Sequence, residues 1–335
     1  MIKKGCYVFM LLLVLSGLLV TGCSTAEEAP TTTEGEETYT IGLSWNRRDE
    51  ALIIAWEDYL QLHGEEYGLE FVINVADGDP LRQNANIEDL ISQGVDVIVA
   101  RAEDGAAIGS AITAAQEAGI PFMTFDRESQ SVTPDAHVGA SSYELAHDMA
   151  LAFAELLEAN GVEGNCIELQ GDLRDQNAVY FHDGWSDAEE ETGAWTTVAV
   201  MPTEWTPEKF RSGVVNGFQA NPDANCLFVA SDFAFDAVRS GLEEVGRYVP
   251  VGEEGHVWIA TIGTMPPALA PMAEGYIDVS GMWDAWFHAE TAAEVIHRLA
   301  TGEDLQGESF LVSGRVATPD TIDTLEHVWS RDYEQ

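Results

Sequence analysis

From residue 39 onward, the hydrophobic positions of the chain follow two alternating patterns. Short runs are almost wholly apolar, as at 95–100, and longer segments carry an apolar residue every three or four positions, as at 81–91. The short runs are typical of strands buried on both faces of a parallel sheet, and the longer period is typical of the helices that cover it. The alternation therefore predicts the α/β class with parallel sheets.

The alternation occurs in two consecutive series. The first series predicts helices that begin near 50, 80 and 108, between strands at 39–45, 71–76, 95–100 and 122–125. The second series begins with a helix at 143–160 and predicts strands at 166–171, 196–201, 226–231, 257–262 and 279–282. A long helix at 285–301 follows. Two such series predict two similar doubly wound lobes that face each other across a cleft.

A charged pair, Asp126-Arg127, stands where the strand at 122–125 ends. Open α/β sheets bind ligands outside the carboxyl ends of their strands. A carboxylate accepts hydrogen bonds from hydroxyl groups, and a guanidinium donates to two neighbouring oxygens, so the pair suits a polyhydroxylated ligand. The alternative role for the pair is a salt bridge within the first lobe.

Residues 1–22 predict a secretory signal peptide. Lys3 and Lys4 provide a positive start, an apolar run follows, and small residues precede Cys23. The run is short for a membrane span and fits a signal better. The segment Val20-Thr21-Gly22-Cys23 resembles the bacterial lipoprotein lipobox, which implies cleavage before Cys23 and a lipid on its sulfur. The alternative is an uncleaved N-terminal anchor.

Residues 23–38 are rich in Ser, Thr, Ala, Pro and Glu and show no apolar period. Such a segment cannot bury enough surface to offset the entropy lost on ordering, so it predicts a flexible acidic tether. With the signal peptide, it indicates an extracytoplasmic protein held by a lipid to a membrane, in the periplasm or at the cell surface.

The chain is strongly acidic, with 58 Asp and Glu against 15 Lys and Arg and a formal charge of −43. Such a field repels phosphate backbones, which excludes nucleic acid as a partner. Adaptation of a secreted surface to high ionic strength explains the charge better than attraction of a cationic ligand, because the acids are spread along the chain.

Two cysteines lie in the folded part of the chain. Cys166 and Cys226 begin two predicted strands, which would be neighbours in a doubly wound sheet with the cysteines level. A disulfide is one reading, but buried free thiols are commoner, and we expect free thiols. No Cys-x-x-Cys, His-Glu-x-x-His or EF-hand spacing is present, so we expect no metal or cofactor.

Several short segments together resemble a known family. They are Gly94-Val95-Asp96-Val97-Ile98, Ala118-Gly119-Ile120-Pro121 with Phe125-Asp126-Arg127, Ile167-Glu168-Leu169-Gln170-Gly171, Asp175-Gln176-Asn177-Ala178, and Asn221-Pro222-Asp223 with Ala230-Ser231-Asp232. In their order and spacing, residues from about 39 to 318 resemble the type I periplasmic (solute-binding) proteins of sugar ABC importers, in the ribose- and xylose-binding branch. Such proteins close like a hinge around a solute.

The resemblance implies that the chain crosses between its lobes three times, near 139–143, 281–284 and 310–316. The N-terminal lobe would then comprise residues 39–141 and 284–309. The C-terminal lobe would comprise residues 142–283 and 310–335.

The resemblance also assigns binding roles. It places Asp126 and Arg127 in the cleft against the ligand, and it places Asp175 and Asn177 there through the xylose-like Asp-x-Asn-Ala pattern. It puts Trp205 against the apolar face of a sugar, since an indole offers a flat surface for C–H groups. The alternative for Trp205 is a tryptophan that anchors its loop in the core.

Other candidates stand at strand ends. Trp45 ends the first strand at the cleft mouth, and Trp283 stands at the second crossing, where relatives usually carry Gln or Lys. For both tryptophans, stacking on a ligand and packing at the hinge stay open. Ser231 and Asp232 occupy the place of an Asn-Asp pair in the family, so we include both as ligand-binding candidates.

Three departures from the family remove polar groups from the second lobe. Ser231 replaces an amide, the family's next Asp falls near Ile262, and His182 stands where the xylose branch has Arg. A buried sugar hydroxyl left unpaired costs about 1–3 kcal/mol. We therefore expect a modified or less hydroxylated sugar, or another small polar solute.

Taken together, these patterns predict a monomeric, lipid-anchored solute-binding protein that delivers a small sugar-like molecule to the permease subunits of an ABC importer. The alternative is a sensory protein that presents its closed form to a chemoreceptor or histidine kinase. An enzyme is not expected, because the chain has no Gly-x-Ser-x-Gly motif, phosphate loop or metal-ligand spacing.

Overall fold

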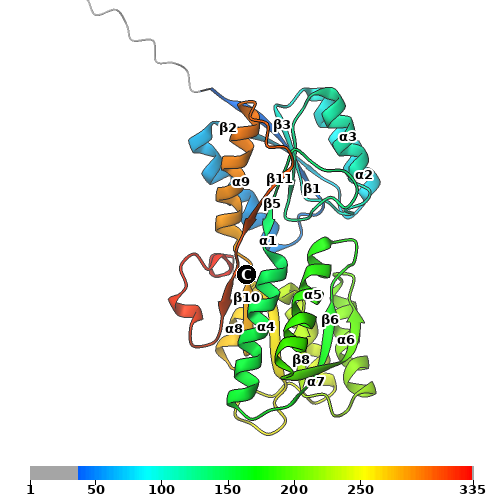
Figure 1. The fold of residues 1–335 in the computed structure, drawn as a ribbon, viewed down its shortest axis with the longest axis vertical. Coiled ribbons are helices and arrows are strands. Elements are labelled where there is room, and N and C mark those ends of the chain that lie inside the picture. Colours follow the sequence, from blue (N-terminus) through cyan, green and yellow to red (C-terminus); the bar gives the residue numbers. More distant parts are fainter. Residues whose placement is uncertain (1–36, 334–335) are drawn as a thin grey trace, which may run out of the picture. The chain divides into compact units, whose positions relative to one another are not determined.

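The first of two sheets contains six strands in the order β11-β5-β4-β3-β1-β2 (Figure 1). The structure is a computed structural model that describes residues 37–333. All pairings in this sheet are parallel. Its strands are β1 (Tyr39–Trp45), β2 (Leu69–Val75), β3 (Val97–Ala100), β4 (Phe122–Phe125), β5 (Ala136–Ala140) and β11 (Glu308–Val312).

The second sheet also contains six strands, in the order β12-β10-β9-β8-β6-β7. Its pairings are parallel except that β12 runs antiparallel to β10. Its strands are β6 (Gly164–Gln170), β7 (Trp195–Pro202), β8 (Cys226–Val229), β9 (Trp258–Gly263), β10 (Val279–Met282) and β12 (Arg315–Ala317). The prediction of two parallel-sheet lobes of the α/β class is therefore confirmed.

Helices accompany both sheets. With the first sheet lie α1 (Ala51–Gly64), α2 (Pro80–Gln93), α3 (Gly109–Ala118) and α9 (Ala285–Ala300). With the second lie α4 (Ser142–Ala159), α5 (Gln176–Thr192), α6 (Pro207–Ala220), α7 (Phe235–Glu244) and α8 (Pro266–Ala273). Short 3₁₀ turns are η1 (Glu65–Tyr67), η2 (Asp232–Ala234), η3 (Ile322–Thr324) and η4 (Trp329–Arg331). The sequence patterns did not identify β5, α8, β11 or β12.

Local chemistry explains where α2 begins and ends. The Asp79 side chain accepts hydrogen bonds from the backbone N–H groups of Leu81 and Arg82, and Pro80 fills the first turn. At the other end, Gly94 adopts a left-handed φ of 70°, which a glycine tolerates without steric cost. Asp79 therefore caps the start of α2.

The chain passes between the two sheets after β5, after β10 and between β11 and β12. Strand β11 pairs with β5 as far as Val312, past the lobe boundary expected at 309. The green helix α4 and the orange helix α9 follow the first two passages directly (Figure 1).

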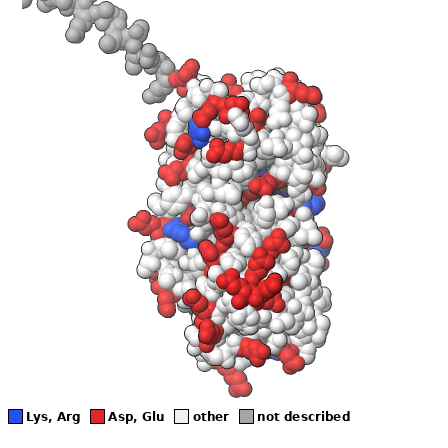
Figure 2. Space-filling view, in the orientation of Figure 1, with Lys and Arg blue, Asp and Glu red and all other residues white. Residues whose placement is uncertain are grey.

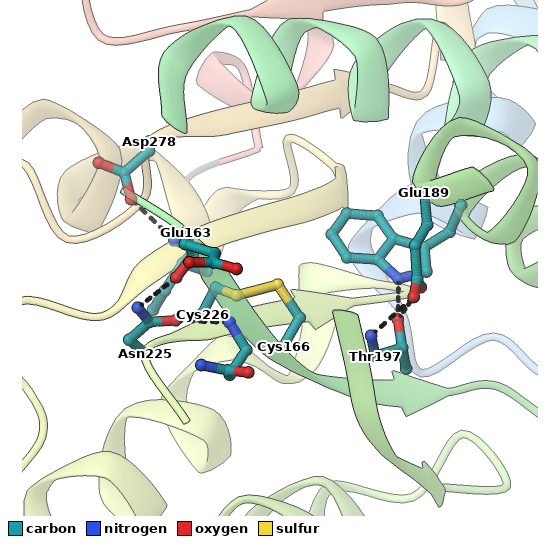
Figure 3. Close-up of a disulfide and its surroundings, with 10 residues drawn as sticks. Glu163, Cys166, Glu189, Thr197, Asn225, Cys226 and Asp278 are labelled. Atoms are coloured by element: carbon teal, nitrogen blue, oxygen red, sulfur yellow. Dashed lines mark hydrogen bonds between the residues drawn. A yellow bond between two sulfur atoms is a disulfide. The ribbon is translucent and has the colours of Figure 1, made fainter. Parts of the chain in front are cut away.

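A disulfide between Cys166 and Cys226 joins β6 to β8 (Figure 3), so the expectation of free thiols was wrong. The two residues pair directly in the parallel register, and their Cα atoms are 4.4 Å apart. The predicted level placement is therefore confirmed, and it brings the two side chains within the range that a disulfide spans. The expectation of free thiols relied on how common they are in general and did not take this proximity into account.

The predicted signal peptide, the lipidation site at Cys23 and most of the tether lie outside the residues that the structure describes. Among residues 37–333, no helix combines the length and apolar character needed to cross a membrane.

Candidate functional site

A cavity lies between the two lobes, with a free volume of about 50 Å³. We call it the central cavity. The first lobe contributes Glu50, Leu52, Arg101, Asp126 and Arg127 to its lining. The second lobe contributes Asp175, Asn177, Phe181, Trp205, Ala230, Ser231, Phe233, Ile262, Gly263, Met265 and Trp283. Seven of the nine predicted binding residues line this cavity, namely Asp126, Arg127, Asp175, Asn177, Trp205, Ser231 and Trp283.

Arg101 and Asp126 form the polar wall of the first lobe. Arg101 follows β3 and Asp126 follows β4, so both stand at carboxyl ends of neighbouring strands. The Nε of Arg101 lies 2.5 Å from Oδ2 of Asp126, and its Nη1 donates to Oδ1 of Asn46 at 2.8 Å. Burial alone would lower the pKa of Arg101, but the charge of Asp126 raises it above the ordinary value. Arg101 therefore stays a cation in a site sheltered from water.

Arg127 carries the polar wall across to the second lobe. Its Nε lies 2.9 Å from Oδ2 of Asp175, the residue that caps α5. Asn177 Nδ2 donates to the backbone oxygen of Asp126 at 3.0 Å. Burial raises the pKa of Asp175, and the nearby Arg127 only partly opposes this. These four predicted residues thus form one cross-lobe polar cluster: Asp126, Arg127, Asp175 and Asn177.

Trp205 provides a flat surface beside this cluster. Its Nε1 donates to Oδ2 of Asp175 at 3.2 Å. The backbone is unusual here, since Glu204 and Trp205 have φ values of 48° and 53°. Left-handed backbone in non-glycine residues costs about 1–3 kcal/mol and concentrates at functional sites. A Cβ at Gly171 would lie 2.2 Å from the indole ring, so glycine there leaves room for the ring.

The rest of the second-lobe wall is largely apolar. Phe181, Phe233 and Met265 line the cavity with the predicted Trp283. The Trp283 indole is only 4% exposed, and its Nε1 has no hydrogen-bond partner among the described residues. A ligand acceptor at that nitrogen would satisfy a buried donor.

Two predicted residues do not line the central cavity. Trp45 is fully buried in the first lobe, where its Nε1 donates to Oε2 of Glu57 at 3.1 Å. Asp232 is also fully buried. Its carboxylate accepts hydrogen bonds from Thr261 Oγ1, the backbone N–H groups of Thr264 and Met265, and Ser280 Oγ. Asp232 thus holds the loop after β9 instead of facing the cleft.

Burial raises the pKa of Asp232 to about 7, although four hydrogen bonds oppose that shift. His182, the second-lobe departure from the xylose pattern, does not line the cavity either. Its Nδ1 lies 2.9 Å from Oε2 of the buried Glu168, whose carboxylate raises the pKa of His182. His182 therefore pairs with a buried carboxylate within the second lobe.

The sequence patterns did not indicate several of the lining residues. Arg101 had a usable signal, because it follows a strand end as Asp126 does. Phe181 lies on α5, and Phe233 lies in η2, the short turn that follows β8. In a single sequence, apolar residues on helices and loops cannot be distinguished from residues of the hydrophobic core.

The cavity and the surface differ in charge. Acidic side chains are spread over the face shown in Figure 2 and outnumber the basic ones there. The cavity lining instead holds the carboxylates of Glu50, Asp126 and Asp175 against the guanidiniums of Arg101 and Arg127. Such a near balance suits a neutral polar ligand.

Known proteins match both the sequence and the fold. A family model described as a periplasmic binding protein domain matches residues 41–304. The chain is 28% identical over 164 residues to the ribose import binding protein of Bacillus subtilis (strain 168), a match that spans 46% of this chain and 53% of that protein. It is 22% identical over 281 residues to the D-xylose-binding periplasmic protein of Escherichia coli (strain K12), spanning 82% of each.

The fold is also similar to that of an ABC transporter solute binding protein from Bacillus halodurans C-125, solved with bound myo-inositol. The TM-score is 0.77 at 24% identity, and the match covers 90% of this chain and all of that one. Because the family model covers most of the chain, this protein belongs to the periplasmic binding protein family.

Proposed function

We propose that the protein captures a small, neutral, sugar-like solute between its lobes and delivers it to an ABC importer. The observation that carries this proposal is the central cavity, in which one polar cluster faces an apolar wall. Arg101 and Arg127 donate to ligand oxygens, while Asp126 and Asp175 accept from hydroxyl groups. Trp205 stacks on the C–H face of the same ligand.

Contacts across the cleft support a closing motion of the two lobes. Asp126 and Arg127 of the first lobe touch Asn177 and Asp175 of the second directly. A polar solute placed there makes the same types of contact to both lobes at once. Binding energy therefore favours the arrangement in which the lobes approach each other.

The relatives support transport of a pentose-like solute. The Bacillus subtilis relative is named for ribose import, and the Escherichia coli relative for D-xylose binding. The apolar second-lobe wall, with Ile262 and Trp283 where the family has polar groups, supports a solute with fewer hydroxyls than those sugars. Cys23 carries the lipid anchor in this proposal, and residues 23–38 let the folded body reach the permease.

A thermal-shift screen of pentoses, hexoses, polyols and nucleosides tests the proposal. Ligand at a thousandfold excess over Kd stabilises the folded state by about 4 kcal/mol, so one clear stabiliser is expected. The absence of a shift with every member of the screen would reject a sugar-like ligand. Incorporation of labelled palmitate into wild-type protein and not into Cys23→Ser tests the anchor separately.

A further inference from the structure

A groove opens beside the central cavity, and its free volume of about 650 Å³ compares with about 50 Å³ for the cavity itself. We call it the outer groove. Five residues line both spaces, namely Glu50, Leu52, Trp205, Phe233 and Met265. The two spaces therefore adjoin each other along these shared residues.

The central cavity alone is small for a sugar. A water molecule needs roughly 10–15 Å³ of such volume, so about 50 Å³ holds only a few waters. Direct contacts between the lobes limit further space, through Asn177 to Asp126 and Tyr180 to Glu128. These contacts use the start of α5 and the loop after β4, which do not line the outer groove. A bound solute therefore has room to extend in the direction of the groove.

The outer groove has its own recognisable chemistry. Pro266, Pro267 and Ala270 of α8 lie along it, in addition to the shared Trp205 and Phe233. Proline and aromatic rings present flat apolar surfaces of the kind that pack on a sugar face or an aromatic ring. Such a surface can accept either a second ring or a group that carries hydroxyls at its edges.

The charges at the outer groove exclude an anionic occupant. Of the residues within 37–333 that line it, Asp49, Glu50 and Asp236 are acidic and Arg47 alone is basic. Arg47 also lies 3.5 Å from the carboxylate of Glu103, which already engages part of its charge. A phosphate or carboxylate in the groove would face net negative charge. An anion is therefore disfavoured, and the near balance of charge in the adjoining central cavity favours a neutral solute over a cationic one.

We propose that the solute has two parts: a hydroxyl-bearing ring whose polar edge reaches the cluster in the central cavity, and a second neutral, partly apolar moiety that lies in the outer groove. The substrate class is thus a neutral glycoside and not a free monosaccharide. This inference rests on the proposed function, because the first part occupies the same polar cluster. The outer groove adds affinity without a new charged contact.

Isothermal titration with matched pairs of ligands tests the inference. The pairs are the methyl and phenyl β-glycosides of D-xylose, D-ribose, D-glucose and D-galactose. For the sugar that the cavity accepts, we expect the phenyl glycoside to bind at least tenfold more tightly than the methyl glycoside. Equal or weaker binding of the phenyl form would overturn the two-part ligand and leave the sugar-binding proposal intact. No binding by any glycoside or free sugar would overturn both.

A pair of variants on one helix separates the groove from the cavity. Ala270→Gln places a longer side chain into the groove, whereas Ala273→Gln adds the same side chain to an exposed position of α8 outside the groove lining. We expect Ala270→Gln to weaken the phenyl glycoside at least fivefold and to leave the methyl glycoside unchanged. Ala273→Gln should change neither. A loss with both variants, or with neither, would contradict the assignment.

Discussion

The two walls of the central cavity present different chemistry to a ligand. In the first lobe, Arg101, Asp126 and Arg127 follow adjacent strand ends and place charges at the cavity. In the second lobe, Trp205, Phe233 and Trp283 present rings and little charge. The shared fold therefore determines where each wall lies, and the residues that line the wall determine its chemistry.

The second lobe also has a carboxylate after a strand end, but this group does not face the cavity. Asp232 follows β8 but turns inward to bind Thr264 and Met265, which shapes the loop after β9. That loop then places Met265 at the cavity. A strand-end carboxylate in the first lobe thus faces the cavity, whereas Asp232 in the second lobe helps to build an apolar surface.

Removing the Asp126 carboxylate should have the largest effect. Asp126→Ala leaves the buried Arg101 guanidinium without its ion pair, and losing one partner of a buried pair costs about 3–5 kcal/mol. We expect the free energy of unfolding, measured by urea titration with tryptophan fluorescence, to fall by about that amount. Ligand-induced thermal shifts should disappear as well.

The matched control for that variant is Asp77→Ala. Asp77 pairs with Arg82 at the surface, where its side chain is 69% exposed. Exposed ion pairs contribute about 0–1 kcal/mol, so this variant should unfold almost as the wild type does. Similar losses in both variants would contradict the view that the first-lobe wall is a buried, energetically coupled cluster.

Removing the disulfide tests a second contrast between the lobes. Among the described residues, the crosslink between Cys166 and Cys226 lies in the second sheet, with 60 residues of sequence separation. A crosslink over such a loop contributes about 2–4 kcal/mol, so the double variant Cys166→Ala/Cys226→Ala should lose that much unfolding free energy. Hydrogen exchange should show the loss mainly in β6 and β8. Reductant should weaken the wild type and leave the double variant unchanged.

Shortening Trp205 should affect binding more than folding. Trp205→Ala removes the stacking surface and the donor to Asp175, and we expect roughly tenfold weaker binding of the stabilising solute, about 1.4 kcal/mol. Trp205→Phe keeps a flat ring and should recover most of that affinity in isothermal titration. If the phenylalanine variant binds as weakly as the alanine variant, the indole N–H matters more than the ring.

The sequence predicted the charged residues of the cavity lining better than the apolar ones for a physical reason. Asp126 and Arg127 are charged residues at a strand end, and few core positions tolerate such a pair, so their pattern is informative. Phe181 and Phe233 are residues that occur both in hydrophobic cores and at ligand sites. Only the folded structure distinguishes core packing from a place in the cavity lining. The same limit explains Trp45, whose strand-end position gave no sign that it points into the core.

The inward carboxylate of Asp232 should make the stability of the protein depend on pH. Its pKa is about 7 in the folded state against 3.8 ordinarily, so the folded protein retains a proton that the unfolded chain releases between these values. The contribution of Asp232 to stability is therefore full below about pH 4 and falls as the pH rises through 7. His137 and His288 act in the opposite direction, because burial lowers their pKa values to about 4 and about 3.

The variant Asp232→Asn separates the carboxylate from those histidines, which it leaves in place. Its amide nitrogen faces one of the backbone donors, so we expect a loss of about 1–3 kcal/mol at every pH. The informative quantity is the slope of unfolding free energy against pH between 4 and 7.5, which should be more positive in the variant than in the wild type. Parallel slopes would show that hydrogen bonds from Thr261, Thr264 and Met265 hold Asp232 ionised throughout. The second lobe would then carry a permanent buried charge, as the first lobe does.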